Sequence, residues 1–278
     1  MNTVSIVGVG LIGGSFALAL RRAGFTGKII GVSSPRTVEE ALRLGVIGEA
    51  RPLEEAAAAS DLIYLAQPIF GIIDTIARLD SCVRPGALVT DAGSTKVKIV
   101  NAAKQHLKRA VFLGGHPMAG KESRGVGAAE AGLFANRTYV LTPEDTAELW
   151  EGPGLEFLGW VEKIGARPFA LTPEQHDRAV ALASHLPQLA STALAASLTE
   201  RSADEAVEST AGPGLSDMTR LALSPFDIWA DILATNTAPI EEGLSRYIEK
   251  LEEFRRKLTD PDLARSFEAA SEFARRVR

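Results

Sequence analysis

The chain has a single cysteine, Cys82, among 278 residues. One cysteine excludes an intrachain disulfide framework and is typical of a reducing compartment. The sequence also lacks an apolar run of the roughly 18–20 residues that a membrane-spanning helix needs. Its first segment reads as a strand rather than as a secretion signal. We therefore expect a cytoplasmic protein with no membrane partner.

The chain also lacks an excess of positive charge and has few aromatic side chains. The formal net charge is −5, aromatic residues make up 6% of the chain, and no block of lysine and arginine interrupts it. Nucleic-acid-binding surfaces need clustered basic residues, so we expect no nucleic-acid partner. Histidine, cysteine and carboxylate residues show no metal-ligand spacing, so we expect no metal site. What is present is a globular composition, 46% hydrophobic, on a chain long enough for two domains.

An apolar β-type segment at the start of the chain ends in glycines and leads directly into a helical apolar pattern. Residues 4–15 read Val-Ser-Ile-Val-Gly-Val-Gly-Leu-Ile-Gly-Gly-Ser. In such a motif the first glycine permits a tight turn, the second lets the backbone approach a diphosphate, and the third lets helix and strand pack closely. The helix N-terminus adds free N–H groups and partial positive charge. The alternative is a glycine-rich turn that only packs well. The pattern predicts a dinucleotide site that includes Gly8, Gly10, Leu11, Ile12 and Gly13.

The end of the second predicted strand, 28–33, indicates which dinucleotide binds. NAD enzymes of this type usually carry Asp or Glu about 20 residues after the glycines, where the carboxylate binds the adenosine ribose. Here that position is Ser33, followed by Ser34 and Arg36, and the first acid is Glu39. Hydroxyls and a guanidinium can hold a 2′-phosphate that a carboxylate would repel. We expect NADP, with NAD as the alternative; Ser34 could instead only cap the next helix, with Arg36 solvated.

Strand and helix patterns alternate along the first 171 residues. Strands are predicted at 28–33, 61–66, 87–90, 110–113, 138–141 and 167–170, and helices at 36–44, 53–59, 71–79, 97–107 and 149–164. This alternation predicts an α/β fold with a Rossmann-type, doubly wound parallel sheet. Gln67 and Pro68 end the 61–66 strand at the carboxyl edge of the sheet, where ligands of such sheets bind. We expect both residues to contact the cofactor.

The character of the sequence changes at Thr172. Thr172, Pro173 and Gln175 form an N-cap, an N1 proline and an N3 amide, which together open a helix. Beyond this point strand patterns vanish and apolar residues recur at helical spacing. We therefore expect a dinucleotide-binding domain at 1–171 and an all-helical domain at 172–278. Because a helical region of this size often cannot bury every apolar stripe by itself, we expect it to form a homodimer.

One of the four histidines follows a predicted buried strand at the edge where the nicotinamide should lie. His116 lies in a Gly-Gly-His-Pro turn, where an imidazole could take a proton from a substrate hydroxyl as hydride leaves the same carbon. Alternatively, it bonds only to backbone. Ser94, at the tip of the neighbouring strand, could orient His116 or contact the reacting hydroxyl. Lys96 is either a charge for cofactor or substrate, or a helix N-terminal residue that faces water.

The second domain carries further polar candidates. His176, in its first helical turn, is interpreted as a capping or hinge residue rather than a functional one. His185 lies in a helical stretch that a proline interrupts, and the local distortion could serve a site. Arg220, near an apolar stretch, is a candidate carboxylate clamp. The alternative for Arg220 is an internal ion pair with Asp217.

Several motifs occur in a characteristic order after the glycines. Residues 91–96 read Asp-Ala-Gly-Ser-Thr-Lys, 116–120 His-Pro-Met-Ala-Gly, 176–177 His-Asp, 184–187 Ser-His-Leu-Pro and 217–220 Asp-Met-Thr-Arg, with Trp229 downstream. With these motifs the chain resembles, over nearly its whole length, the prephenate/arogenate dehydrogenase family of tyrosine biosynthesis. The resemblance implies a nucleotide-binding domain followed by a helical dimerisation domain. It also implies NAD(P)-dependent oxidative decarboxylation of prephenate to 4-hydroxyphenylpyruvate, or of arogenate to tyrosine.

The resemblance further implies roles for single residues. His116 would accept the proton of the ring hydroxyl, and Ser94 would hold that hydroxyl and His116. Arg220 matches the carboxylate-binding arginine of the family. Glu122 and Asp217 match two acidic positions of the family that gate or polarise the site. Trp229 matches a tryptophan that reaches the partner subunit's site.

One position departs from the pattern of many prephenate-using members. These read Ser-His-Leu-Pro-His, whereas the last position here is Gln188. A neutral amide can donate a hydrogen bond but carries no charge, so arogenate, or both substrates, remains the alternative to prephenate. His185, Gln188 and Lys121 complete the expected substrate-binding set. Rival interpretations are another dehydrogenase with a Rossmann-type and a helical domain, and a non-catalytic NADP-binding protein.

Overall fold

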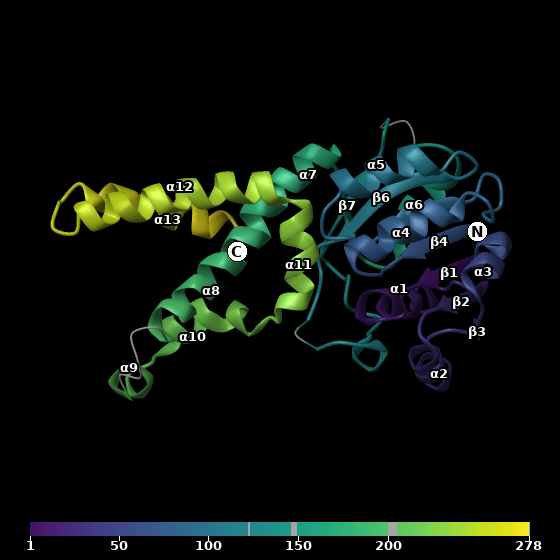
Figure 1. Cartoon of the computed structure of the whole chain (residues 1–278), viewed down its shortest axis with the longest axis horizontal. Coiled ribbons are helices and arrows are strands. Elements are labelled where there is room, and N and C mark those ends of the chain that lie inside the picture. The colour runs from purple at the N-terminus through teal and green to yellow at the C-terminus, as the bar shows by residue number, and fades with distance from the viewer. Residues whose placement is uncertain (122, 146–148, 200–204, 278) are drawn as a thin grey trace.

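The first part of the molecule is built on one mixed sheet. The computed structural model describes residues 1–121, 123–145, 149–199 and 205–277. Eight strands lie in the order β3-β2-β1-β4-β5-β6-β7-β8 (Figure 1). They are β1 (Thr3–Val7), β2 (Lys28–Val32), β3 (Glu49–Ala50), β4 (Leu62–Leu65), β5 (Leu88–Asp91), β6 (Val111–Pro117), β7 (Thr138–Thr142) and β8 (Arg167–Ala170). Strands β1 to β6 pair in parallel, whereas β7 is antiparallel to β6 and parallel to β8. The predicted Rossmann-type sheet is confirmed.

Helices cover both faces of this sheet, as the continuous apolar strands require. They are α1 (Leu11–Arg22), α2 (Pro35–Arg43), α3 (Leu53–Ala59), α4 (Ile69–Leu79), α5 (Val97–His106) and α6 (Gly152–Lys163). One apolar cluster contains side chains of α1 and α6, and the other contains side chains of α3, α4 and α5. On the first face Phe16 stacks on Tyr64 with ring centroids 4.0 Å apart.

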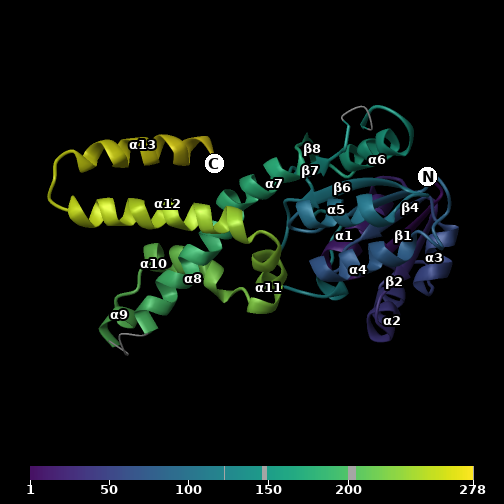
Figure 2. The same cartoon turned by 45° about the horizontal axis from the view of Figure 1, so that its top comes forward.

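Beyond Thr172 the described elements are helical, as the periodicity predicts. They are α7 (Pro173–Val180), a π-helical turn (Ala181–His185), α8 (Leu186–Thr199), α9 (Glu205–Ser209), α10 (Pro213–Thr219), a 3₁₀ turn (Arg220–Leu223), α11 (Phe226–Thr235), α12 (Thr237–Arg256) and α13 (Leu263–Arg276). Helices α12 and α13 lie side by side and extend away from the sheet (Figures 1 and 2). Phe254 of α12 stacks on Phe267 of α13. In the described part of the chain, no helix combines the length and apolarity that a membrane crossing demands.

The helical part docks onto the carboxyl edge of the sheet through polar contacts. The Thr95 and Thr235 hydroxyls lie 2.8 Å apart, and Lys98 Nζ donates to the Ala234 carbonyl at 2.8 Å. The Asp177 carboxylate accepts from the backbone N–H groups of Lys96 and Val97 at the start of α5. These contacts hold α7 and α11 against the segment that follows β5 and the start of α5.

Strand β6 is longer than predicted, and this corrects the expectation that His116 lies in a turn. The strand continues through Pro117 because its second half pairs with β7, with His116 opposite Val140. Gly115 permits this course, since a Cβ there would lie 2.7 Å from the Asp91 carbonyl oxygen. His116 is therefore held on a strand, paired on the side that faces β7.

Candidate active site

A cleft of about 360 Å³ opens at the carboxyl edge of the sheet. It lies where the strand order reverses between β1 and β4, which is where sheets of this type bind their ligands. Of the cofactor-binding residues predicted from the sequence, five line it: Gly10, Leu11, Ile12, Gln67 and Pro68.

The glycine motif has the geometry that a dinucleotide needs. Gly8 has φ +93°, and a Cβ on it would lie 2.7 Å from the Ala66 carbonyl carbon. A Cβ on Gly13 would lie 2.2 Å from the Gly8 oxygen, so strand and helix pack directly against each other. Gly10, at the N-cap of α1, has nothing within 4 Å of its would-be Cβ. The residues present therefore fit a diphosphate, with open space at a helix N-terminus that supplies N–H donors.

Ser33, Ser34 and Arg36 lie one strand away, after β2, and are exposed rather than part of this cleft's lining. Ser34 caps α2, because its hydroxyl accepts from the Thr37 N–H at 3.4 Å. The capping alternative for Ser34 is therefore present in the structure. It is compatible with phosphate binding, because the same helix N-terminus favours negative charge.

A second cleft, of about 510 Å³, lies between the sheet and the helical part. It shares Ser94, Lys121, Ile228 and Ile232 with the first cleft, so a ligand in one can reach a ligand in the other. Seven of the predicted catalytic and substrate-binding residues line it, although they are spread over 136 positions of the chain: Ser94, His116, Lys121, His185, Gln188, Arg220 and Trp229.

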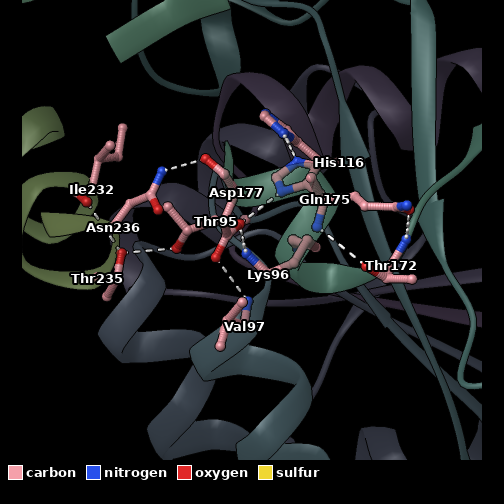
Figure 3. A network of polar contacts seen from close by, with 12 residues as sticks. Thr95, Lys96, Val97, His116, Thr172, Gln175, Asp177, Ile232, Thr235 and Asn236 are labelled. Atoms are coloured by element: carbon pink, nitrogen blue, oxygen red, sulfur yellow. Dashed lines mark hydrogen bonds and ion pairs between the residues drawn. The ribbon is translucent and has the colours of Figure 1, made fainter. Parts of the chain in front are cut away.

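His116 belongs to a chain of three hydrogen-bonded side chains that crosses from β6 to α7 (Figure 3). His116 Nδ1 lies 2.8 Å from His176 Nε2, and His176 Nδ1 lies 2.8 Å from Asp177 Oδ1. Burial, followed by the nearby His176, holds the pKa of His116 well below its ordinary value of 6.5. Burial also lowers the pKa of His176, against the opposing effect of the Asp177 carboxylate. Both imidazoles are therefore neutral at pH 7.

The structure corrects the interpretation of His176 as a capping or hinge residue. Thr172 caps α7 in a capping box with Gln175, whereas the His176 side chain is fully buried and reaches across to His116. Ser94 makes no hydrogen bond to His116 among the described contacts, so the bond that orients His116 comes from His176. No local sequence pattern predicts this role, because His116 and His176 meet only when the two parts of the chain dock.

Lys96 fits neither of the alternatives expected for it. Its side chain is fully buried, and its ammonium donates to the Asp91 carboxylate and, at 2.7 Å, to the Gly115 carbonyl. Asp91 also accepts from the N–H groups of Gly93 and Gly115. This buried ion pair ties β5, the start of α5 and β6 together beneath His116.

His185 ends the π-helical turn, so the distortion expected before Pro187 is present at the cleft. The Asn236 amide nitrogen donates to the Asp177 carbonyl at 2.8 Å and lies 3.2 Å from His185 Nδ1. Since a carbonyl only accepts, this atom is an NH₂ group, and His185 Nδ1 must be the acceptor. Burial lowers the pKa of His185 to about 4, so the neutral ring presents Nε2–H as a donor.

The remaining substrate-site candidates differ in their placement. Lys121 forms a 2.5 Å ion pair with Glu130 at the rim of the cleft. Trp229 lies edge-on to the His185 ring, and its indole donates to Ser224 at 2.9 Å. Asp217 is exposed on α10 and is not among the residues that line the cleft. Glu122 lies outside the described residues.

The two halves of the chain match two parts of one known family. The nucleotide-binding domain of prephenate dehydrogenase matches residues 16–151, and its dimerization domain matches residues 172–270. The chain belongs to the prephenate dehydrogenase family. It is 34% identical to the prephenate dehydrogenase of Lactococcus lactis over 272 residues, which cover 94% of this chain and 73% of the relative.

Solved structures of the prephenate dehydrogenase family share the whole architecture. The prephenate dehydrogenase of A. aeolicus in complex with hydroxyphenyl propionate and NAD⁺ is 30% identical, with a TM-score of 0.90 and coverage of 100% of this chain and 99% of that one. Synechocystis arogenate dehydrogenase is also 30% identical, with a TM-score of 0.84 and coverage of 99% and 100%. The expectation of an NAD(P)-dependent dehydrogenase of this family is thereby confirmed.

Proposed function

We propose that this chain oxidatively decarboxylates prephenate to 4-hydroxyphenylpyruvate, with NADP⁺ preferred over NAD⁺. The observation that carries the proposal is His116, a neutral imidazole held on a strand and lining the second cleft, which shares lining residues with the cleft at the glycine motif. A general base must be unprotonated at the working pH and within reach of the proton that it removes. His116 meets the first condition, and its place in the lining gives it access to a ligand.

The reaction couples three bond changes. When bound, the oxidised nicotinamide supplies the acceptor for the hydride on the hydroxyl-bearing ring carbon. His116 Nε2 takes the hydroxyl proton, the ring carboxylate leaves as CO₂ as the ring becomes aromatic, and the proton on His116 returns to the resulting phenolate oxygen to give the phenol. Arg220 lines the same cleft and offers a guanidinium for a substrate carboxylate. Ser94, between the clefts, hydrogen-bonds the reacting hydroxyl, and Ile228 and Ile232 exclude water.

The NADP preference rests on the residues after β2. Ser33, Ser34 and Arg36 offer hydroxyls and a positive charge where a ribose-binding carboxylate would otherwise stand. An exposed guanidinium beside a helix N-terminus favours a 2′-phosphate. The expected result is a higher kcat/KM with NADP⁺ than with NAD⁺, and a strong NAD⁺ preference would contradict this part of the proposal.

Gln188 supports arogenate as the second candidate substrate. Its amide nitrogen donates to the Leu221 carbonyl at 2.8 Å and to the Thr192 hydroxyl at 3.2 Å. Because Leu221 offers only an acceptor, this atom is the NH₂ group, and both of its hydrogens are used. The carbonyl oxygen, which bonds no described residue, is then the atom left for a ligand in the cleft. An acceptor suits the ammonium of arogenate better than the keto oxygen of prephenate.

The experiment is a comparison of four rates, prephenate and arogenate each with NAD⁺ and NADP⁺, followed through the absorbance of the reduced nicotinamide. The wild type is compared with His116→Ala. Loss of the general base should lower kcat about 10²–10⁴-fold while the affinity for NADP⁺ is retained. His106→Ala, which removes a histidine from the end of α5, is the matched control and should keep the wild-type rate.

Each outcome tests a different part of the proposal. An unchanged kcat in folded, cofactor-binding His116→Ala would show that the mechanism is wrong. Faster turnover of arogenate than of prephenate by the wild type would select the second candidate. No turnover of either substrate by the wild type would remove the proposed function.

We also propose a domain boundary near residue 171 and a homodimer formed through 172–278. Support comes from the match of the family's dimerization domain to this region and from α13, which buries none of its residues within one chain. Large apolar side chains remain exposed on it, Phe267 and Phe273 among them.

A further inference from the structure

We infer that His176 and Asp177 are positioning residues that fix His116 in the tautomer able to accept a proton at Nε2. The inference rests on the proposed role of His116 as general base, and it adds two residues from the other part of the chain. The base lies on β6, whereas the pair that orients it lies on α7.

The tautomers follow from the order of donors and acceptors. The Asp177 carboxylate can only accept, so His176 Nδ1, 2.8 Å away, carries a proton. A neutral His176 then has a lone pair at Nε2, and His116 Nδ1, 2.8 Å from it, must be the donor. His116 is thereby left with its lone pair at Nε2, the nitrogen that is free for a ligand in the cleft.

Asp177 is itself fixed, which makes the tautomer assignment rigid. Besides His176, its carboxylate accepts from the backbone N–H of Lys96 at 2.6 Å and of Val97 at 3.0 Å. Its backbone carbonyl accepts from Asn236. The Asp177 carboxylate therefore cannot turn away from His176 without losing its hydrogen bonds to the backbone N–H groups at the start of α5.

The same arrangement offsets the charge that forms when His116 takes the proton. The charged or titratable groups that face His116 are His176 from α7, His185 from the π-helical turn and Lys96 from the start of α5. The Lys96 ammonium is paired with Asp91. The carboxylate in line with the new imidazolium is that of Asp177, and hydrogen bonds to charged groups are stronger than neutral ones.

The tautomer can be measured directly in the wild-type chain. Long-range ¹H–¹⁵N correlation spectra of protein labelled with ¹⁵N-histidine distinguish protonated from unprotonated ring nitrogens, and four histidines give a tractable spectrum. Spectra of single-histidine variants assign the signals. We expect His116 protonated at Nδ1 and not at Nε2, and His176 likewise. A His116 protonated at Nε2 would overturn the inference.

Two substitutions of His176 test the effect on turnover. In His176→Gln the amide oxygen can still accept from His116 Nδ1, whereas in His176→Leu nothing can. We expect His176→Gln to retain at least about a tenth of the wild-type kcat and His176→Leu to lose about 100-fold or more. The Kd for NADP⁺, measured by fluorescence titration, should change less than about threefold in both. Equal kcat losses in the two variants would contradict the inference.

A double substitution separates this role from a purely structural one. If His176 acts through His116, His176→Leu should lower the residual rate of His116→Ala by less than about threefold. A further 100-fold loss in that background would overturn the inference. The proposed function fails on a different result, an unchanged rate in His116→Ala alone. A normal rate in His176→Leu with a slow His116→Ala would remove only the positioning role.

Discussion

Two neutral histidines that line one cleft present opposite chemistry to a ligand. His116 offers a lone pair because Nδ1 is used as a donor to His176. His185 offers an N–H because its Nδ1 accepts from Asn236. In both rings the partner on the buried side decides what the open side can do. A base and a donor can thus be set by residues that need not touch the substrate.

At the scale of single residues, the buried histidines predict that the protein loses stability as the pH falls. An unfolded imidazole titrates near pH 6.5, whereas burial holds the pKa of folded His185 at about 4. Below pH 6.5 the unfolded chain therefore binds protons that the folded chain does not, and the free energy of unfolding falls as the pH drops from 6.5 toward 4. The loss should approach about 1.4 kcal/mol per pH unit for each such group.

Chemical denaturation at pH 7.5, 6.5, 5.5 and 5.0 at fixed protein concentration measures this slope. His185→Gln should reduce the decline, whereas His106→Gln, outside the buried network, should leave it unchanged. A free energy of unfolding that stays level between pH 6.5 and 5.0 would show that these rings are not held neutral.

At the scale of elements, α7 matters most because it carries His176 and Asp177. Its N-terminus is closed by a capping box, in which the Thr172 hydroxyl accepts from the Gln175 N–H at 3.2 Å and the Gln175 side chain accepts from the Thr172 N–H. We expect Thr172→Ala to lower the free energy of unfolding by about 1 kcal/mol. Denaturant titration at pH 7.5 measures the change, and Thr26→Ala, at an exposed loop position, is the control that should stay within about 0.5 kcal/mol.

Structural features that depend only on nearby residues could be predicted from the sequence. The glycine motif, the capping box at Thr172 and the distortion before Pro187 depend on neighbours within a few residues, and all three are in the structure. The end of β6 could not be read in this way. It depends on β7, which begins more than 20 residues later and pairs with residues 114–117.

At the scale of the whole molecule, docking of the two parts creates the contacts that sequence reasoning missed. His176 looks like a first-turn helix residue until α7 is placed beside β6. In the sequence, Lys96 is either a charge for cofactor or substrate or a residue that faces water, whereas in the structure its ammonium is enclosed by Asp91 and the Gly115 carbonyl. The motifs at 91–96 and 116–120 pointed to lining residues of the cleft, because both lie at the carboxyl ends of neighbouring strands of the sheet. The bonds among these motifs required the three-dimensional arrangement.

At the scale of the whole molecule, the exposed apolar face of the helical part also predicts that two copies of the chain form a dimer. Phe273 is 59% exposed and Phe267 63% exposed on α13, an amphipathic helix that has no buried residue within one chain. An apolar face of this kind marks an interface. We expect sedimentation at micromolar concentration to give about twice the chain mass of 29.5 kDa. Phe273→Glu should weaken the dimer at least about tenfold, because it places a charge in an apolar contact. Leu42→Glu, at an equally apolar but 42% exposed position on α2, is the matched control and should leave the dimer intact. A wild-type monomer would leave the face of α13 without a partner copy and would remove the proposed homodimer.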